Sequence, residues 1–194
     1  MSFASGHARE LETLTQETRE NISRFTAIDA DPASLDFAKI SAGSIPFRSH
    51  HLNVVKSDIL PDEESDLVYS LGLFDYLSEE HAEAVLHKMW NLTTSSGQIV
   101  VANLAPDAAN LGFCEAIMDW WMITRDSTNM RALGNHIKRQ VNSAAAEVSV
   151  VKHGCFNYLE INRSEPVESA QNPFCCERDP GSVPGIPRAN GHLL

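Results

Sequence analysis

The sequence pairs an acidic residue with a glycine at a spacing that suits nucleotide binding. Asp29 follows residues 25–28, an apolar run with β-branched members that is typical of a buried strand. Gly6 lies 23 residues earlier, in a Ser5-Gly6 turn, and nucleotide-binding units place their ribose-binding acid roughly 20 residues after the glycine turn. A carboxylate at the tip of a strand can accept hydrogen bonds from both ribose hydroxyls. The spacing predicts a nucleotide-binding βαβ unit, and the alternative is that Asp29 only ends a strand.

The elements that must position this pair follow from local signals. Residues 2–4 are expected to end a first strand, and residues 8–20 are expected to form a helix with Leu11 and Leu14 turned inward. Asp31 is a predicted helix N-cap, followed by proline at the first helical position. The result is the order strand, turn, helix, strand, acid and helix.

The rest of the chain continues this alternation of helices and strands. Periodicity and turn signals predict a loop over 43–48, strands over 52–55, 66–70 and 98–104, a helix that starts after Ser78 and ends before 95–97, and helices over 110–123 and 126–137. Residues 146–153 and 156–162 alternate like half-buried strands around Gly154-Cys155, which indicates an antiparallel hairpin. The predicted fold class is therefore α/β, with a doubly wound, mostly parallel seven-stranded sheet that closes with a C-terminal antiparallel hairpin.

Composition indicates one globular domain followed by a tail. A chain of 194 residues with 43% hydrophobic residues can bury one core of ordinary size. Five of its nine prolines fall within residues 164–194, and proline cannot donate to a helix or a strand ladder. We expect a domain over residues 1–163 and a disordered or loosely packed tail over 164–194.

The net charge, the hydropathy pattern and the cysteines disfavour several kinds of function. A net charge of −11 disfavours a nucleic-acid phosphate backbone as partner. No apolar run approaches the ~20 residues that span a bilayer, and no signal-peptide pattern opens the chain, so we expect a cytoplasmic protein. The cysteines lack metal-ligand spacing and are expected to be free thiols; they are Cys114, Cys155, Cys175 and Cys176.

An ordered series of motifs points to a family. SGHAREL, FTAIDADPASLDFAK, NVVKSDI, DLVYSLGLFDYLS and GQIVVANLAPD together resemble the motif series of class I S-adenosylmethionine-dependent methyltransferases, over residues 2–107. The predicted hairpin extends the resemblance to residue 162, because this family inserts its last strand antiparallel. The segment GFCEAIMDWWMITRD, residues 112–126, is more loosely similar to bacterial methyltransferases that make the methyl ester of 3-hydroxypalmitic acid.

This resemblance implies S-adenosylmethionine as cofactor, and assigns its contacts residue by residue. They are Ser5, Gly6, His7 and Ala8 for the amino-acid part, Asp29, Ala30, Asp58 and Ile59 for the ribose and adenine, and Ser70 and Leu71 for the methionyl portion. The family has glycines where this chain has Ala4 and Ala8. It also has an acid near the position of Ser2, for which Glu10 is the candidate substitute. Because the chain begins inside its first strand, we expect an N-terminus truncated at that strand.

The implied reaction is methyl transfer to an oxygen of a small-molecule or lipid-like acid, with a carboxylate as one option. Transfer from a sulfonium is an in-line displacement, so proximity and orientation supply most of the catalysis. A carboxylate acceptor needs a cation or a hydrogen-bond donor, and Arg125 and His7 are the donors expected near the mouth of the site. The acceptor-side candidates are Tyr76, Asn103, Glu115, Asp119 and Arg125.

Neighbouring residues have plainer interpretations. Glu115 and Asp119 are four apart and are expected to share a helix face, where the alternative is a solvated stripe. The pair Trp120-Trp121, with Met118 and Met122, is interpreted as core, and the alternative is an apolar acceptor pocket. The pair at positions 50 and 51, both histidines, is interpreted as exposed loop residues rather than metal ligands.

Two other functions stay open at this point. A nicotinamide-dependent oxidoreductase could use Asp29 equally well, although the chain lacks G-x-G-x-x-G and closes with a hairpin. A catalytically degenerate methyltransferase fold that serves as an interaction or regulatory module would agree with the altered glycine loop.

Overall fold

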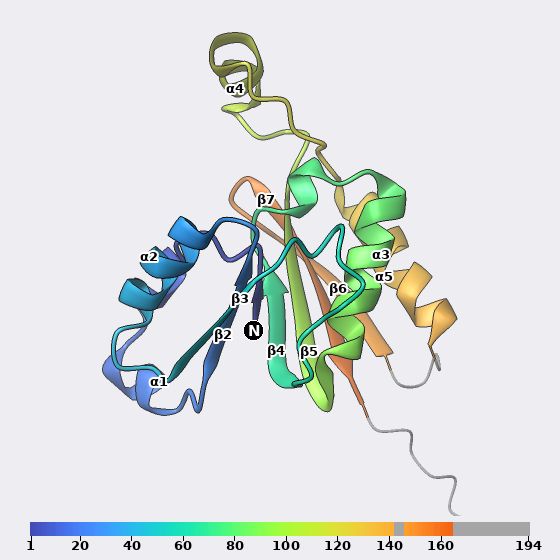
Figure 1. Ribbon diagram of the computed structural model, residues 1–194. Coiled ribbons are helices and arrows are strands. Elements are labelled where there is room, and N and C mark those ends of the chain that lie inside the picture. The colour runs from blue at the N-terminus through green and yellow to red at the C-terminus, as the bar shows by residue number, and fades with distance from the viewer. Residues whose placement is uncertain (142–145, 165–194) are drawn as a thin grey trace, which may run out of the picture.

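The computed structural model describes residues 1–141 and 146–164, which build one seven-stranded sheet flanked by helices (Figure 1). The sheet order is β3-β2-β1-β4-β5-β7-β6. Its strands are β1 Ser2–Phe3, β2 Phe25–Asp29, β3 Phe47–His51, β4 Ser65–Ser70, β5 Thr93–Leu104, β6 Ala146–His153 and β7 Phe156–Arg163. The first five strands are parallel to one another, and β7 inserts antiparallel between β5 and β6, as predicted.

The described helices are η1 Arg9–Thr13, α1 Gln16–Glu20, α2 Pro32–Ala42, η2 Phe74–Tyr76, α3 Glu79–Asn91, α4 Leu111–Met118 and α5 Ser127–Gln140. Four of them, α1, α2, α3 and α5, begin where a side chain accepts from their free amides. The Asp31 carboxylate accepts from the amides of Ala33 and Ser34, each over 3.1 Å, so the predicted cap of α2 is confirmed. No helix within the described ranges combines the length and apolarity that crossing a bilayer requires.

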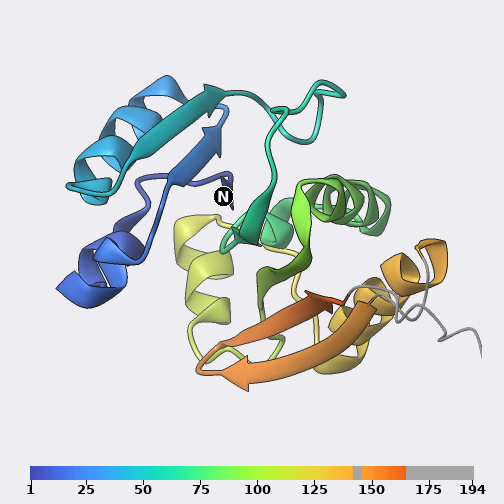
Figure 2. The same ribbon diagram turned by 90° about the horizontal axis from the view of Figure 1, so that it is seen from below.

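The sheet carries a separate apolar core on each face. Seen from below, α3 (green) and α5 (gold) lie on one side of the sheet, where they pack on Ile28, Val68 and Ile99 (Figure 2). On the other side, η1 and α2 pack on neighbouring positions of the same strands, such as Ala27 and Tyr69. Successive strand residues point to opposite faces, so the buried stretches of β2, β4 and β5 carry apolar residues at neighbouring positions, as parallel strands covered on both faces require.

The third strand lies earlier in the chain than the sequence predicts. β3 occupies residues that were expected to form a loop in part, and 52–55 forms a turn instead of a strand. The sequence of β3, FRSHH, lacks an apolar run because this strand lies at the sheet edge and pairs only with β2. Lys88 Nζ donates to the carbonyls of Val54 (3.0 Å) and Ser57 (2.8 Å), and Val54 is buried under α3. The apolar pattern at 52–55 therefore reflects a packed turn.

Three other predicted bounds are also corrected. The helix expected over 8–20 is split into η1 and α1, because Ala8 is left-handed, Leu14 is extended and Thr15 caps a new helix. β5 begins at Thr93 and so includes residues 95–97, which were predicted to be a break. The helix expected over 110–123 ends at Met118, because the chain becomes left-handed at the next residue. The tail predicted over 164–194 lies outside the described residues, except for Ser164.

Candidate functional site

The glycine turn and the acid of the predicted βαβ unit meet at the carboxyl edge of the sheet. Gly6 N donates to Asp29 Oδ2 over 2.8 Å, and Asp31 N donates to Asp29 Oδ1 over 2.9 Å. Ser5 N also donates to the Ile28 carbonyl over 3.1 Å, which ties the turn to the tip of β2. Each carboxylate oxygen has two lone pairs, so both oxygens of the half-buried Asp29 can accept one further hydrogen bond.

The loop after β1 keeps a glycine-type backbone although it contains a single glycine. Ala4, Gly6 and Ala8 all have positive φ, at 50°, 51° and 49°. A left-handed backbone costs an L-residue roughly 1–2 kcal/mol. The conformation of Ala4 and Ala8 is therefore strained. A Cβ added at Gly6 would meet no atom within 4 Å, so this side of the turn is open. The backbone can therefore be approached closely at Gly6.

The residues expected around the adenine lie on two separate segments. The exposed Ala30 follows β2 directly, and its carbonyl accepts from His51 Nε2 over 2.9 Å. Asp58 and Ile59 lie further along the turn after β3, and Ile59 is 83% exposed. Because β3 ends at His51, Asp58 is seven residues beyond the strand rather than at its tip. Within the described residues no hydrogen bond joins Asp58 or Ile59 to the Gly6–Asp29 pair, so their cofactor role stays a prediction.

The remaining predicted cofactor residues border the same edge. His7 stacks on Phe37 of α2, with ring centroids 4.5 Å apart. Ser70 is fully buried, and its hydroxyl donates to the Phe3 carbonyl over 3.0 Å, which fastens the end of β4 to β1. Leu71 follows it and is 40% exposed. Ser70 therefore aligns the strand ends, and Leu71 is the one of the two that a ligand can touch.

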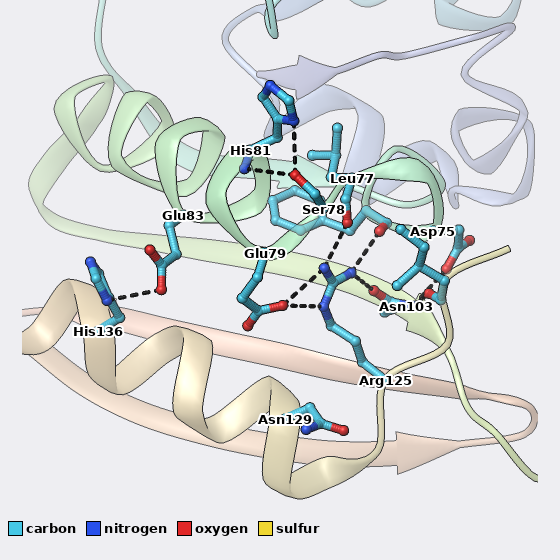
Figure 3. A network of polar contacts seen from close by, with 12 residues as sticks. Asp75, Leu77, Ser78, Glu79, His81, Glu83, Asn103, Arg125, Asn129 and His136 are labelled. Carbon is cyan, nitrogen blue, oxygen red and sulfur yellow. Dashed lines mark hydrogen bonds and ion pairs between the residues drawn. The ribbon is translucent and has the colours of Figure 1, made fainter.

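A buried polar network lies beside this edge, under the loop that follows β4 (Figure 3). Asp75 Oδ1 accepts from Asn103 Nδ2 over 2.8 Å and from Leu104 N over 2.7 Å. Asn103 Nδ2 also donates to the Ile123 carbonyl over 2.8 Å. Burial raises the pKa of the Asp75 carboxyl, although the Leu104 amide and the charge of Arg125 act to lower it. Sequence reasoning missed Asp75, whose signal is an acid between the apolar residues Phe74 and Leu77.

Arg125 holds this network together. Its guanidinium donates to Asn103 Oδ1 (2.7 Å), to the carbonyls of Phe74 (2.8 Å) and Leu77 (2.7 Å), and twice to Glu79 Oε2 (3.1 and 3.2 Å). Those contacts use all five of its N–H groups, and the residue is 3% exposed. As the described chain stands, Arg125 has no N–H left for a methyl acceptor, so we interpret it as a positioning residue.

The other acceptor-side candidates belong to the segment around α4. Trp120 Nε1 donates to Tyr76 Oη over 2.6 Å, and both side chains are about half exposed. Asp119 accepts from Trp121 Nε1 over 2.8 Å. The expectation that Asp119 shares a helix face with Glu115 is wrong, because Asp119 is left-handed and lies outside α4. Trp120 and Trp121 are 43% and 67% exposed, so the interpretation of this pair as core is also wrong.

A groove of about 650 Å³ lies away from this edge, on the sheet face that carries η1. Leu67, Tyr69 and Val100 belong to its lining. Glu10, the candidate substitute for the family acid, is bound here, because its Oε1 accepts from Tyr69 Oη over 2.5 Å. Burial and this carboxylate raise the pKa of Tyr69. Of the predicted cofactor residues, only Leu71 contributes to the groove.

Potential metal ligands do not cluster in the part of the chain that the structure describes. Within residues 1–141 and 146–164, no three His, Cys, Asp or Glu side chains gather closely enough to hold an ion. The two neighbouring histidines lie in β3 rather than in a loop, and His50 Nε2 contacts Glu63 Oε1 at 3.2 Å. Arg24 and Arg48 also pair with Glu63, at 3.1 and 2.8 Å.

The sheet order, the glycine turn and the acid at the tip of β2 define an α/β protein of the nucleotide-cofactor-binding type. Residues 1–101, more than half of the chain, match the methyltransferase domain family. The chain therefore belongs to that family. No protein of curated function matches the sequence.

Solved structures share the fold at low identity. A possible exported protein from Bordetella parapertussis superposes with a TM-score of 0.64 at 20% identity, over 84% of this chain and 61% of that one. An O-methyltransferase family protein from Burkholderia thailandensis gives 0.63 and 14%, over 84% and 50%. Magnesium protoporphyrin IX methyltransferase from Synechocystis PCC 6803, with bound SAH, gives 0.59 and 12%, over 84% and 72%. The chain thus spans about half to three quarters of the length of these proteins.

Proposed function

We propose that the protein binds S-adenosylmethionine at the carboxyl edge of β1, β2 and β4 and transfers its methyl group to an oxygen of a small-molecule or lipid-like acid. The observation that carries the cofactor assignment is the contact between the Gly6 amide and Asp29 Oδ2. It brings an open glycine turn and a carboxylate with unused acceptor capacity to one place. A similar protein, the magnesium protoporphyrin IX methyltransferase, was crystallised with SAH.

In this proposal each part of the site has a stated task. Asp29 accepts from the ribose hydroxyls, and the turn at Gly6 faces the amino-acid part of the cofactor. Leu71 and Tyr76 flank the methyl group and the acceptor. Because Arg125 is fully engaged, the acceptor oxygen is held by other hydrogen-bond donors, and His7 is the proposed donor. Catalysis then consists of holding the acceptor oxygen in line with the bond from the methyl carbon to the sulfonium sulfur, which breaks as the new oxygen–carbon bond forms.

Calorimetric titration with S-adenosylhomocysteine tests the cofactor site. We expect binding by the unaltered protein, and Asp29→Ala should lower the affinity at least tenfold, because hydrogen bonds to charged groups contribute ~1.5–3 kcal/mol each. Asp36→Ala is the matched control, since this exposed acid lies on α2 and should leave the affinity unchanged. No binding at millimolar ligand, or equal affinity of Asp29→Ala and the unaltered protein, would contradict the proposal.

The acceptor needs a separate experiment. Incubation with methyl-labelled S-adenosylmethionine and a panel of fatty acids, hydroxy acids and amines should give label in an ester or ether. Label found only on nitrogen or sulfur would show that the proposed acceptor class is wrong, even if the cofactor binds. A match to the methyltransferase domain family over 1–101 does not favour the nicotinamide-dependent alternative.

A further inference from the structure

The helix α4 and the segment after it expose an unusual amount of apolar surface. We call residues 111–123 the apical lobe, because Figure 1 shows α4 standing clear of the rest of the molecule above the carboxyl edge of the sheet. Cys114 is the only buried residue of α4. The exposed large apolar side chains of the lobe are Phe113, Ile117, Met118, Trp120, Trp121 and Ile123, between 43% and 71% exposed. Large apolar side chains exposed together on one segment are typical of interaction sites.

The lobe is fastened to the body at its base. Ile123 N donates to the Asp75 carbonyl over 2.7 Å, and Arg125 N donates to the Leu104 carbonyl over 3.1 Å. Trp120 Nε1 donates to Tyr76 Oη over 2.6 Å. These contacts join the returning segment to η2 and to the end of β5. The base is therefore held firmly while α4 projects, so the apolar surface is presented outward.

The charged residues of the lobe indicate which class of partner it can bind. Residues 111–123 contain no lysine or arginine, and their charged residues are Glu115 and Asp119. The whole chain carries −11. Anionic membranes bind basic segments, and the lobe has no basic residue. Its two carboxylates would instead be repelled by an anionic partner. The tryptophan N–H groups are already bound within the chain, by Tyr76 and Asp119, so they do not call for acceptors on a protein partner.

We propose that the apical lobe docks into an uncharged, zwitterionic lipid surface. A projecting convex lobe can reach a flat surface, whereas a concave groove cannot. An eight-residue helix is too short to cross a bilayer, so α4 would lie in the interface with Phe113 and Ile117 inserted. Trp120 and Tyr76, which join at the base of the lobe, are residue types enriched at the headgroup level. This proposal is independent of the nature of the methyl acceptor.

Cosedimentation with vesicles tests this inference on the full chain. We expect the protein to bind phosphatidylcholine vesicles and to bind phosphatidylglycerol vesicles more weakly. Tryptophan emission should shift to the blue on binding, because two of the three tryptophans lie in the lobe and the third, Trp90, is already buried at 7% exposed. Ile117→Ser should weaken partitioning about tenfold, the effect expected for one large buried apolar side chain.

A matched control separates the lobe from apolar surface in general. Ile40 on α2 is 73% exposed and Ile117 is 71% exposed, so Ile40→Ser removes the same side chain from a helix elsewhere and should leave partitioning unchanged. Circular dichroism of both variants checks that they are folded. Tighter binding to phosphatidylglycerol, or equal loss in the two variants, would overturn the proposal. The proposal would also be overturned if the unaltered protein did not bind vesicles but self-associated, and if Ile117→Ser abolished this self-association. The partner of the lobe would then be a second copy of the chain.

Discussion

Gly6 and Asp29, 23 residues apart, are joined by a hydrogen bond of 2.8 Å from the Gly6 amide to Asp29 Oδ2. The bond fixes the tip of β2 against the loop after β1 before any ligand is present. A second bond, from the amide of Asp31, fixes the other carboxylate oxygen. The Asp29 carboxylate is thus held in one orientation. A ligand that donates hydrogen bonds to it therefore binds without a large loss of side-chain entropy.

Gly6→Ala should affect binding more than folding. The left-handed φ of 51° costs alanine roughly 1–2 kcal/mol, and the added Cβ meets no protein atom within 4 Å. In the proposed complex this Cβ would occupy the space through which the cofactor approaches the backbone. We expect a modest fall in melting temperature and at least a tenfold loss of S-adenosylhomocysteine affinity by calorimetry. A loss of stability without a loss of affinity would place the cofactor elsewhere.

The two left-handed alanines give a prediction of opposite sign. Ala4→Gly should stabilise the free protein by about 1 kcal/mol, because glycine adopts φ near 50° without steric cost. Ala8→Gly should be closer to neutral, because Ala8 is 2% exposed and loss of its buried methyl offsets about 0.8 kcal/mol of the gain. Urea unfolding of both variants measures the difference. Destabilisation by Ala4→Gly would contradict the strain that we infer in this loop.

Much of the fold could be predicted because its signals are local. The cap and proline at Asp31 and the alternation of the closing hairpin each depend on a few neighbouring residues. β3 was missed because an exposed edge strand with the sequence FRSHH needs no apolar run. The helix over 110–123 was overextended because apolar periodicity does not reveal the left-handed residue Asp119.

Only part of the site could be predicted, because only part of it follows from a sequence motif. A recurring motif spacing identified Asp29 and the glycine turn, 23 residues apart, whereas no such motif relates the residues of the Arg125 network, which are 22 to 51 positions apart. An arginine near a predicted mouth can equally bind a ligand or tie loops together. The two roles are distinguished by the number of N–H groups that are free to bind a ligand. In this structure all five N–H groups of Arg125 donate to other groups of the protein.

Asp75 should make stability depend on pH. Because its folded pKa is raised above 3.8 by burial, its contribution to stability is present at low pH and is lost as the pH rises through the folded pKa. Asp75→Asn keeps an oxygen that can accept from Asn103 and Leu104 and has no charge to bury. The free energy of unfolding of the unaltered protein, minus that of Asp75→Asn, should therefore fall as the pH rises above the ordinary carboxyl pKa of about 4.

Asp75→Ala provides the contrasting variant. It leaves the Leu104 amide and one N–H of Asn103 without their acceptor, and each buried unsatisfied donor costs roughly 1–3 kcal/mol. We expect Asp75→Ala to be clearly less stable than Asp75→Asn in urea unfolding at every pH tested. Equal stability of the two variants, or a difference that rises with pH, would mean that Asp75 is not the buried acceptor described above.

The two ends of the ion pair between Arg125 and Glu79 should respond very differently to substitution. Arg125→Met removes the donors to Asn103 Oδ1 and to the carbonyls of Phe74 and Leu77, so the free energy of unfolding should fall by on the order of 3–5 kcal/mol. Glu79→Gln should cost about 0–1 kcal/mol, because the Glu79 side chain is 56% exposed. Urea denaturation of both variants measures this asymmetry. Equal and small losses would show that the guanidinium is not the anchor of the loop after β4, and the lobe held at its base would then need another support.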